Sequence, residues 1–557
     1  MPQRSGAQIL LEVLKSEGVE VVFGIPGGVV LPIMDAFHEV KEPRFILTRH
    51  EQGAGHAADG YARVTGKVGV CLATSGPGAT NLVTALATAN FDSVPVVAIT
   101  GQVKTHLIGN DAFQEADITG ITRPITKHNY LVKDVTKLGE SLRAAFHIAR
   151  TGRPGPVLID IPTDVATAKT DAPVPDQADL PGYRPVIKGN RRQIKRAAEA
   201  IDAAARPLLY VGGGVIIAGA SETLRALATK CNIPVTTTLL ALGAFPEDHA
   251  LSLKMLGMHG TAYANYAVQQ SDLLIAIGAR FDDRITGDVK KFAPHAKIIH
   301  VDIDPSSISK NIRVDIPVVG DAKDILEGLL EACLPREHPE WLAQIAEWKA
   351  KHPLAYKEGG LKPQYVIEQI CEVSGGKAII CTEVGQNQMW SAQWYTHRYP
   401  RHFITSGGLG TMGYGFPAAI GAQVGRPDAL VVDIAGDGSI QMNIQELATA
   451  VQNKLPVKIC ILNNGYLGMV RQWQELFYDR HYSGSVLDGN PDFVKLAEAY
   501  GAKGLRVTRT EEVRPALAKA FADPSVWILD FMVDREENVF PMVPSGEAID
   551  RMIGGMA

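Results

Sequence analysis

Residues 429–464 read ALVVDIAGDGSIQMNIQELATAVQNKLPVKICILNN, and this stretch decides the fold class. Its first apolar run ends in Gly436-Asp437-Gly438-Ser439. A helical pattern follows from about Met442 to Gln452, and a second apolar run, Val457–Leu462, ends in Asn463-Asn464. Two buried strands joined by a helix form a βαβ unit, in which the strands run parallel. The stretch therefore predicts a parallel α/β sheet.

The two strands of this unit end in polar side chains that are 464 − 437 = 27 positions apart. A right-handed crossover brings both strand ends to the same sheet edge, so Asp437 and Asn464 are expected to meet. A carboxylate and an amide oxygen suit Mg²⁺, which completes its shell with phosphate oxygens and water. Gly436 and Gly438 let backbone N–H groups approach such phosphates. An isolated Gly-Asp-Gly is more often a plain turn, but this spacing predicts a magnesium–diphosphate site.

Two helix starts are also predicted from the sequence. Asn443 and Glu446 have the spacing of a capping box, which places the start of the helix between the two strands near Met442. Near the N-terminus, Ser5 is expected to cap a helix over residues 6–17.

The same alternation of apolar runs and helical patterns continues along almost the whole chain. A Pro-rich tract at 172–182 and a charged stretch at 335–360 interrupt it and are expected to be linkers. We therefore expect three doubly wound parallel-sheet α/β domains, over residues 1–180, 188–340 and 360–557. Predicted strands lie at Val19–Phe23, Phe45–Leu47, Val68–Ala73, Val96–Thr100, Pro156–Ile161, Pro207–Val211, Ile233–Thr237, Leu273–Ile277, Lys297–Ile303, Lys377–Thr382, Leu430–Ile434, Val457–Leu462 and Trp527–Phe531.

Composition narrows the class of protein. The 557 residues are 46% hydrophobic and 21% charged, as in an ordinary globular enzyme of several domains. The net charge of −5 argues against a nucleic-acid or anionic-membrane partner. The six cysteines form no C-x-x-C pair, so neither a zinc site nor a disulfide framework is expected. No apolar stretch reaches the ~18 residues of a membrane span and no signal segment is evident, so we expect a cytoplasmic protein.

The pattern from Gly436 to Asn464 resembles the cofactor motif of thiamine-diphosphate enzymes. The resemblance implies a pyrimidine-binding, a central FAD-binding and a diphosphate-binding domain, in that order. It implies that Asp437, Asn464 and Tyr466 hold Mg²⁺. It also implies that the cofactor contacts Val384, Gln386, Gly410, Met412, Gly436, Gly438 and Ser439.

The segment Thr48–Arg63 resembles the part of these enzymes that carries the activating carboxylate. Glu51 would bond the aminopyrimidine ring of the cofactor, so that this ring can deprotonate the reactive carbon. In the family this carboxylate reaches a cofactor held by another subunit, which implies at least a homodimer. Alternatively, Glu51 is a charge that complements a helix dipole. Met412, in Gly408–Gly415, matches the apolar wedge that bends the cofactor, although methionine is usually core filler.

Nearly end to end, the chain resembles acetolactate synthases (acetohydroxyacid synthases). These enzymes decarboxylate pyruvate and join the two-carbon unit to pyruvate or 2-ketobutyrate, the first common step of valine, leucine and isoleucine biosynthesis. The resemblance places Gly28, Phe113 and Gln114 beside Glu51 as catalytic residues. It pairs Arg284 with the carboxylate of the second ketoacid and lines the acceptor pocket with Trp473 and Met258. Alternatively, Arg284 forms a surface ion pair and Trp473 is a core aromatic.

The central block resembles an FAD-binding domain, in which the flavin would be mainly structural because the reaction has no net redox step. Three glycines after a strand are a weak signal alone, since a tight turn explains them equally well. His259 could also be an ordinary core histidine. The matching positions are Arg153, Gly212, Gly213, Gly214, Met258, His259, Gly278, Arg280, Asp282, Asp302 and Asp321.

Other members of the class remain as alternatives. Glyoxylate carboligase lacks the activating glutamate, pyruvate oxidase uses its flavin for redox chemistry, and catabolic acetolactate synthases lack flavin. A non-enzymatic role is disfavoured because Glu51, Met412, Asp437 and Asn464 occur together. The resemblance implies a homodimer or homotetramer and a possible small regulatory subunit. Lys104 and Thr163 depart from the Pro and Lys of some relatives, which bears on inhibitor sensitivity rather than on the chemistry.

Overall fold

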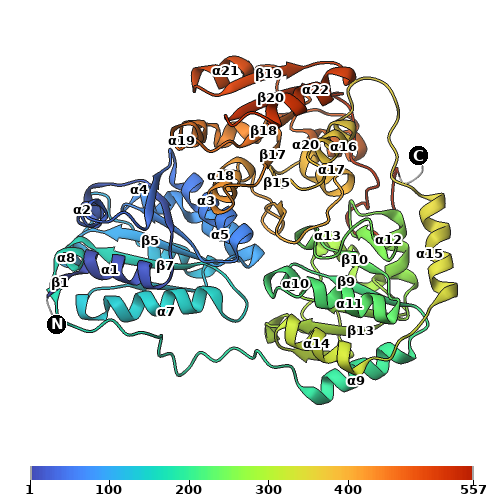
Figure 1. Cartoon of the computed structure of the whole chain (residues 1–557), viewed down its shortest axis with the longest axis horizontal. Coiled ribbons are helices and arrows are strands. Elements are labelled where there is room, and N and C mark those ends of the chain that lie inside the picture. Colours follow the sequence, from blue (N-terminus) through green and yellow to red (C-terminus); the bar gives the residue numbers. More distant parts are fainter. Residues whose placement is uncertain (1–2, 555–557) are drawn as a thin grey trace.

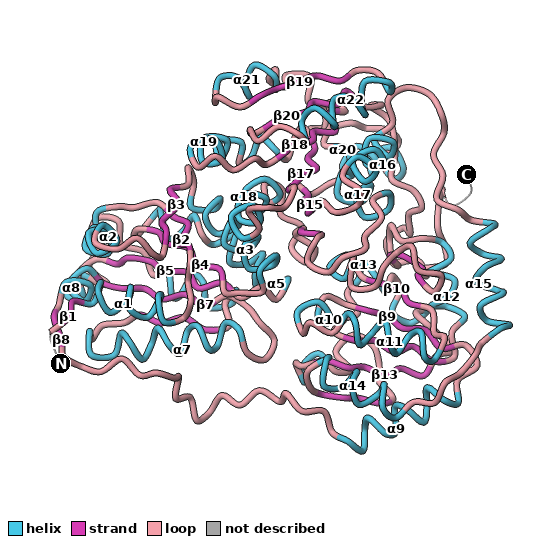
Figure 2. Tube along the Cα trace, in the orientation of Figure 1, coloured by secondary structure: helices cyan, strands magenta, loops and turns pink. Residues whose placement is uncertain are grey.

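The structure, a computed structural model, describes residues 3–554 and contains three six-stranded sheets (Figures 1 and 2). Every strand pair in these sheets is parallel. Such sheets need helices on both faces to bury their apolar strands, and the intervening helices supply them. The prediction of three doubly wound α/β units is confirmed.

The first block lies at the left of Figure 1 and has the strand order β3-β2-β4-β5-β7-β6. Its strands are β2 (Val21–Gly24), β3 (Arg44–Leu47), β4 (Gly69–Ala73), β5 (Val96–Gln102), β6 (His128–Leu131) and β7 (Val157–Pro162). Its helices are α1 (Gly6–Ser16), α2 (Leu31–His38), α3 (Glu51–Thr65), α4 (Pro77–Asn81), α5 (Val83–Asp92), α6 (Ile118–Thr122), α7 (Leu138–Arg150) and α8 (Thr163–Thr167). A short antiparallel pair, β1 (Arg4–Ser5) with β8 (Lys169–Thr170), ties its two ends together.

The central block, at the lower right of Figure 1, has the order β11-β10-β9-β12-β13-β14. Its strands are β9 (Pro207–Val211), β10 (Val235–Thr237), β11 (Ser252–Met255), β12 (Leu273–Ile277), β13 (Lys297–Asp302) and β14 (Ile316–Val319). Its helices are α9 (Arg191–Ala203), α10 (Gly214–Ile217), α11 (Ser221–Cys231), α12 (Ala262–Gln270), α13 (Asp283–Thr286) and α14 (Ala322–Ala332), and α15 (Pro339–Lys351) leads out of it. The order reverses between β9 and β12, which is where ligands bind in such sheets.

The third block has the order β16-β15-β17-β18-β20-β19. Its strands are β15 (Ile379–Thr382), β16 (Phe403–Ile404), β17 (Val431–Gly436), β18 (Lys458–Asn463), β19 (Lys503–Val507) and β20 (Trp527–Met532). Its helices are α16 (Pro363–Val373), α17 (Gln386–Trp394), α18 (Gly415–Gly425), α19 (Leu447–Gln452), α20 (Gly468–Phe477), α21 (Phe493–Ala499) and α22 (Thr510–Phe521). Its strands follow the same order of connection as those of the first block, a repeat of architecture that the sequence did not reveal.

The first and third blocks meet along helices α3 and α18, which lie side by side in the middle of the molecule (Figure 1). Small residues let the two backbones touch. A Cβ added to Gly60 would lie 2.1 Å from the carbonyl oxygen of Ala418, and one added to Gly421 would lie 1.8 Å from that of Ala57. The crossing therefore has no room for larger side chains.

One helix start was predicted well and the other was not. Ser5 caps α1 through a capping box with Gln8, as expected. The helix predicted from Met442 begins only at Leu447, and two 3-10 turns precede it. Asn443 does not cap this helix, because its side-chain amide donates to the Gly413 carbonyl (2.6 Å). A contact distant in sequence thus overrides the local signal.

Two further features complete the fold. Residues 171–190 contain no helix or strand and run along the bottom of Figure 1 from the first block to the central block. Within residues 3–554, no helix is both long enough and apolar enough to span a membrane.

Candidate active site

The structure brings Asp437 and Asn464 together at the carboxyl edge of the third sheet. β17 and β18 are neighbours, and the Asn464 N–H lies 3.4 Å from Asp437 Oδ1. Both side chains are buried, with 1% and 5% of their surface exposed. Asp437 follows β17, next to the point between β15 and β17 where the strand order reverses.

Asp437 is an acid held in a polar but cation-free environment. Burial raises its pKa to about 6, and a hydrogen bond from Asn490 Nδ2 to Oδ2 (2.6 Å) opposes that rise. None of the arginines or lysines in residues 3–554 forms an ion pair with it. A buried carboxylate without a positive partner is unstable unless a cation joins it, so this observation fits a metal ion at Asp437.

Asn490 and Gln386 are the neighbours that orient the pair. Asn464 Nδ2 donates to Gln386 Oε1 (3.2 Å), which leaves the Asn464 side-chain oxygen turned toward the N–H of Tyr466 (3.1 Å). Gln386 was among the predicted cofactor residues, whereas Asn490 was not. Asn490 comes from a loop 53 residues beyond Asp437, and no pattern in the sequence links the two.

A small cavity of about 60 Å³ lies over this edge. It is lined by the predicted metal and diphosphate residues, namely Val384, Gln386, Met412, Gly436, Asp437, Gly438, Ser439, Asn464 and Tyr466. As expected for a ligand site in a parallel sheet, these residues lie at strand ends or in the loops that follow them, except Gln386, which begins helix α17.

A much larger cavity of about 890 Å³ opens beside the small one, and Val384 and Met412 line both. It reaches from the third block into the central block, where it lies over the reversal point between β9 and β12. All the residues predicted to contact flavin or substrate from the central block line it, together with Arg153 from the first block and Gly410 and Trp473 from the third. The central-block residues are Gly212, Gly213, Gly214, Met258, His259, Gly278, Arg280, Asp282, Arg284, Asp302 and Asp321.

Two of these residues, Arg284 and Trp473, face each other across the cavity. The guanidinium carbon of Arg284 lies 5.9 Å from the centre of the Trp473 ring system, a cation–π arrangement. Arg284 sits in α13 and Trp473 in α20, so the central and third blocks each supply one of them. A planar cation beside an apolar wall suits a small carboxylic acid with an alkyl end.

In the central block, two backbone turns approach each other so closely that only glycine fits. A Cβ on Gly212 would lie 2.0 Å from the Gly278 carbonyl oxygen, and one on Gly214 would lie 2.7 Å from the Gly278 Cα. Two backbone turns cross here without side chains. Such a crossing leaves the peptide groups free to approach a phosphate.

His259 lies in this cavity wall, and burial lowers its pKa to about 4. Its Nδ1 is 3.3 Å from the Pro541 carbonyl oxygen. The imidazole is therefore neutral at physiological pH, as in a core histidine, while it also lines the cavity.

The four residues predicted from the first block gather at the carboxyl edge of its own sheet. Gly28 follows β2, Glu51 follows β3, and Phe113 and Gln114 follow β5. Glu51 is 8% exposed and accepts a hydrogen bond from Asn81 Nδ2 (2.9 Å). Phe113, by contrast, is 88% exposed. Within the described part of one chain, none of the four lines either cavity.

Glu383 and Glu446 are buried acids of this region whose contacts the sequence did not predict, since Glu446 was expected only in a capping box with Asn443. Glu383 accepts hydrogen bonds from the N–H groups of Gly413 (2.7 Å) and Phe416 (3.1 Å), and burial raises its pKa to about 7. Glu446 accepts from the N–H groups of the residues just before Glu51, Arg49 (3.0 Å) and His50 (2.9 Å). Both act on backbone groups far away in the sequence, so no local pattern reveals them.

Comparison with known proteins agrees with this geometry. Profiles of three domains match the chain: the N-terminal TPP binding domain of thiamine pyrophosphate enzymes at residues 4–121, their central domain at 194–329, and their C-terminal TPP binding domain at 383–531. The fold and the site thus define a thiamine pyrophosphate enzyme.

Proteins similar to this chain identify its family within the class of thiamine pyrophosphate enzymes. The chain is 54% identical to the acetolactate synthase large subunit of Corynebacterium glutamicum over 562 residues, covering 98% of this chain and 90% of that protein. It is 49% identical to the acetolactate synthase large subunit of Haemophilus influenzae, covering 99% and 98%. It is also 52% identical to the acetolactate synthase of Mycobacterium bovis, covering 99% and 92%. The chain belongs to the acetolactate synthase large-subunit family.

Proposed function

We propose that the chain is a catalytic subunit that decarboxylates pyruvate and joins the two-carbon unit to pyruvate or 2-ketobutyrate. One observation carries this proposal: the Asp437–Asn464 edge opens, past Val384 and Met412, onto a cavity that contains Arg284 and Trp473. A cofactor tail fixed at that edge would direct its reactive end into a space that has a carboxylate partner and an apolar wall.

Thiamine diphosphate and Mg²⁺ fit the residues at this edge. Asp437 lacks a positive partner in the described chain, and Gly436 and Gly438 line the small cavity with no side chain of their own. Asp437 and Asn464 would hold the metal through side-chain oxygens, and Tyr466 would hold it through its backbone. When bound, thiamine diphosphate supplies a nucleophilic carbon and an electron sink, which no side chain offers.

The chain's own residues would then bind and orient the second ketoacid and exclude water from the site. Arg284 binds the carboxylate of the second ketoacid and so presents its keto carbon in one direction. Trp473 contacts the alkyl end and favours the ethyl group of 2-ketobutyrate over the methyl group of pyruvate. Met412, which lines both cavities, would contact the cofactor, and the apolar wall would exclude water from the site.

We further propose that FAD occupies the large cavity in a structural role. Its volume of about 890 Å³ and the bare backbone at Gly212–Gly214 fit an extended dinucleotide. Asp302 ends β13 and Asp321 follows β14, at positions where acidic side chains commonly bind ribose hydroxyls. Arg280 supplies positive charge on the same wall.

The position of Glu51 supports an assembly of at least two copies. A single chain keeps Glu51 and the exposed Phe113 away from its own cofactor cavities. A second copy would bring them to the Met412 side and would cover the Phe113 ring. We propose a homodimer or homotetramer in the cytoplasm, with a small regulatory subunit as a possible partner.

Product analysis tests this function. Dialysed protein is incubated with pyruvate and 2-ketobutyrate together, with thiamine diphosphate, Mg²⁺ and FAD each omitted in turn. We expect CO₂ release with 2-acetolactate and 2-aceto-2-hydroxybutyrate, dependent on the first two additions. Acetate with flavin bleaching would instead indicate a pyruvate oxidase, and activity on glyoxylate alone would indicate glyoxylate carboligase.

A metal-site variant accompanies this test. Asp437→Asn keeps the side-chain size and removes the negative charge, so we expect thiamine-diphosphate binding and product formation to be lost together. Asp428→Asn changes an exposed acid of the same block and serves as the matched control.

A further inference from the structure

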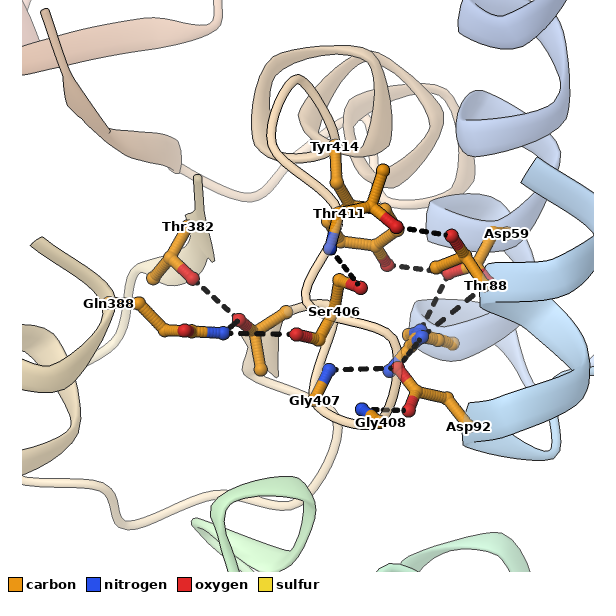
Figure 3. A network of polar contacts seen from close by, with 12 residues as sticks. Asp59, Thr88, Asp92, Thr382, Gln388, Ser406, Gly407, Gly408, Thr411 and Tyr414 are labelled. Carbon is orange, nitrogen blue, oxygen red and sulfur yellow. Dashed lines mark hydrogen bonds and ion pairs between the residues drawn. The ribbon is translucent and has the colours of Figure 1, made fainter. Parts of the chain in front are cut away.

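The segment 405–414, which carries Gly410 and Met412, is held from two sides (Figure 3). On the third-block side, Gln388 Nε2 donates to Thr405 Oγ1 (2.7 Å) and to the Ser406 carbonyl (3.1 Å). On the other side, helices α3 and α5 of the first block reach it. The first block thus anchors a segment that borders both cavities. Within the described chain, Arg153 is the one predicted residue of the first block that lines either cavity.

Asp92, at the end of α5, makes the closest of these first-block contacts with the backbone. Its Oδ1 accepts the N–H of Gly408 (2.7 Å), and its Oδ2 accepts the N–H of Gly407 (3.0 Å). The side chain is fully buried. One carboxylate therefore binds two successive peptide groups, and each of its oxygens is used.

Arg63 of α3 balances the charge. It donates to Asp92 Oδ2 (2.8 Å) and, through Nε, to Asp59 Oδ1 (2.6 Å). Burial alone would lower the pKa of Arg63, but Asp59, Tyr414 and Asp92 together hold it well above its ordinary value. One guanidinium thus pairs with two buried carboxylates inside the molecule.

Two further contacts continue along the segment. The hydroxyls of Thr88 and Thr411 are 2.7 Å apart, and the Tyr414 hydroxyl donates to Asp59 (2.5 Å) (Figure 3). Asp59, Thr88 and Asp92 are named here the first-block clamp. Its three contacts lie before, inside and after the stretch Gly410–Met412.

The clamped segment needs external support. Gly407, Gly408, Gly410 and Gly413 give it little rigidity of its own, and Gly410 and Gly413 have φ of +70° and +84°. Gly407, Gly408, Gly410 and Met412 all line the large cavity, and Met412 also lines the small one. A shift of this backbone would alter both cavities at once.

We propose that Asp92 is a positioning residue that sets, through Gly407 and Gly408, where Met412 stands and how the wall of the large cavity is shaped. The expected kinetic effect rests on the proposed carboligase activity, and the expected binding effect rests only on the proposed FAD site. Asp92 itself borders the large cavity, but both of its carboxylate oxygens already bind Gly407, Gly408 and Arg63, and it lines no part of the small cavity that holds the predicted metal ligands.

The decisive variant is Asp92→Asn. It keeps the shape of the side chain but offers one acceptor oxygen and an NH₂ donor, so one of the two glycine N–H groups must face another donor. Displacement of a catalytic segment by about 1 Å can cost about 10²-fold in rate. We expect kcat to fall by about that factor, the KM for pyruvate to change less than about threefold, and the Kd for FAD, read by flavin fluorescence, to rise about tenfold.

Matched variants separate positioning from general damage. Glu17→Gln alters another buried first-block carboxylate, which binds two arginines, Arg143 (2.6 Å) and Arg150. Arg150 borders the large cavity, but Glu17 lines neither cavity and makes no hydrogen bond to the segment 405–414. We expect Glu17→Gln to keep the wild-type kcat and FAD affinity even if its melting temperature falls. Thr88→Val should lose part of the activity, whereas Thr88→Ser, which keeps the hydroxyl, should restore it.

Three results would contradict the positioning role of Asp92. If Asp92→Asn keeps kcat and FAD affinity within about twofold of wild type, the proposal is wrong. It is also wrong if Glu17→Gln loses both to the same extent, or if Thr88→Ser behaves like Thr88→Val. If wild-type protein forms no acetolactate, the proposed function fails, but the FAD titration of Asp92→Asn against Glu17→Gln still decides the positioning role.

Discussion

Glu51 combines burial, a single side-chain hydrogen bond and a position at the first turn of α3. Glu51→Gln keeps the size of the side chain and its contact with Asn81 but removes the carboxylate that would bond the pyrimidine ring under the proposed function. We expect kcat to fall by about 10²- to 10⁴-fold while thiamine-diphosphate affinity stays within a few-fold. Steady-state assays and cofactor titration measure the two effects. Glu12→Gln, on an exposed part of α1, is the control, and a near-wild-type rate for Glu51→Gln would remove Glu51 from its role.

Trp473 offers a test of substrate preference. Trp473→Leu removes the flat wall that faces Arg284 but leaves an apolar side chain. Contact with one extra methylene is worth about 1–3 kcal/mol, so we expect the preference for 2-ketobutyrate to fall about tenfold or more while acetolactate still forms. The ratio of the two products under competition measures this change. Phe477→Leu, which alters the edge-on ring 6.2 Å away on the same helix, should leave the ratio unchanged.

Among single residues, the sequence predicted those that share a strand-end motif and missed those that meet their partners through contacts distant in sequence. Asp437 and Asn464 were predictable because a βαβ unit determines where its strand ends lie. Asn490 and Asp92 were not, since each meets its partner through a contact between segments 53 and more than 300 residues apart. The roles of the predicted residues are proposals. The structure places those of the central and third blocks in two neighbouring cavities, and it places Gly28, Glu51, Phe113 and Gln114 outside both.

The α3–α18 crossing is the contact between elements that is most sensitive to substitution. In Gly60→Ala the new methyl group would clash with the Ala418 backbone, which cannot move away without separating the helices. Overpacking of this kind typically costs about 1–3 kcal/mol. Thermal unfolding should therefore show a clearly lower midpoint. Gly182→Ala, in open space on the linker, is the control and should unfold like the wild type.

Among strands, the sequence located those inside the sheets better than those at the edges. Every interior strand corresponds to an apolar run, because a central strand of a parallel sheet is buried on both faces. The strands missed in the three sheets were β6, β11, β14, β16 and β19, each at an edge. β19 (Lys503–Val507) illustrates the reason: its residues are mostly exposed or half-buried, so it lacks the continuous apolar signal.

At the scale of the whole molecule, Glu247 joins the central block to the third block, where its carboxylate accepts the N–H of His397 (3.0 Å). Burial raises the pKa of Glu247 from its ordinary value of 4.5 to about 7. Between these two pH values the folded chain holds a proton that the unfolded chain releases. The stabilising contribution is therefore complete below about pH 4.5 and is lost as the pH rises through 7.

Glu247→Gln should remove this pH dependence. Its free energy of unfolding relative to wild type should increase with pH between 5 and 8, by up to about 1.4 kcal/mol per pH unit. Chemical denaturation at several pH values measures the difference. Asp248→Asn, at the exposed neighbouring acid, provides the baseline. A constant difference between Glu247→Gln and wild type across that range would contradict the buried, protonated state.

The exposed connection over residues 171–190 has a consequence for how the molecule comes apart. The backbone runs from the first block to the central block, but the first block packs against the third block through the tight α3–α18 crossing. A protease that cuts only within residues 171–190 would produce two polypeptides that stay associated. They would elute as one species in size-exclusion chromatography and give two bands on a denaturing gel. The association of helices α3 and α18, rather than the continuous backbone, would thus keep the cleaved molecule in one piece.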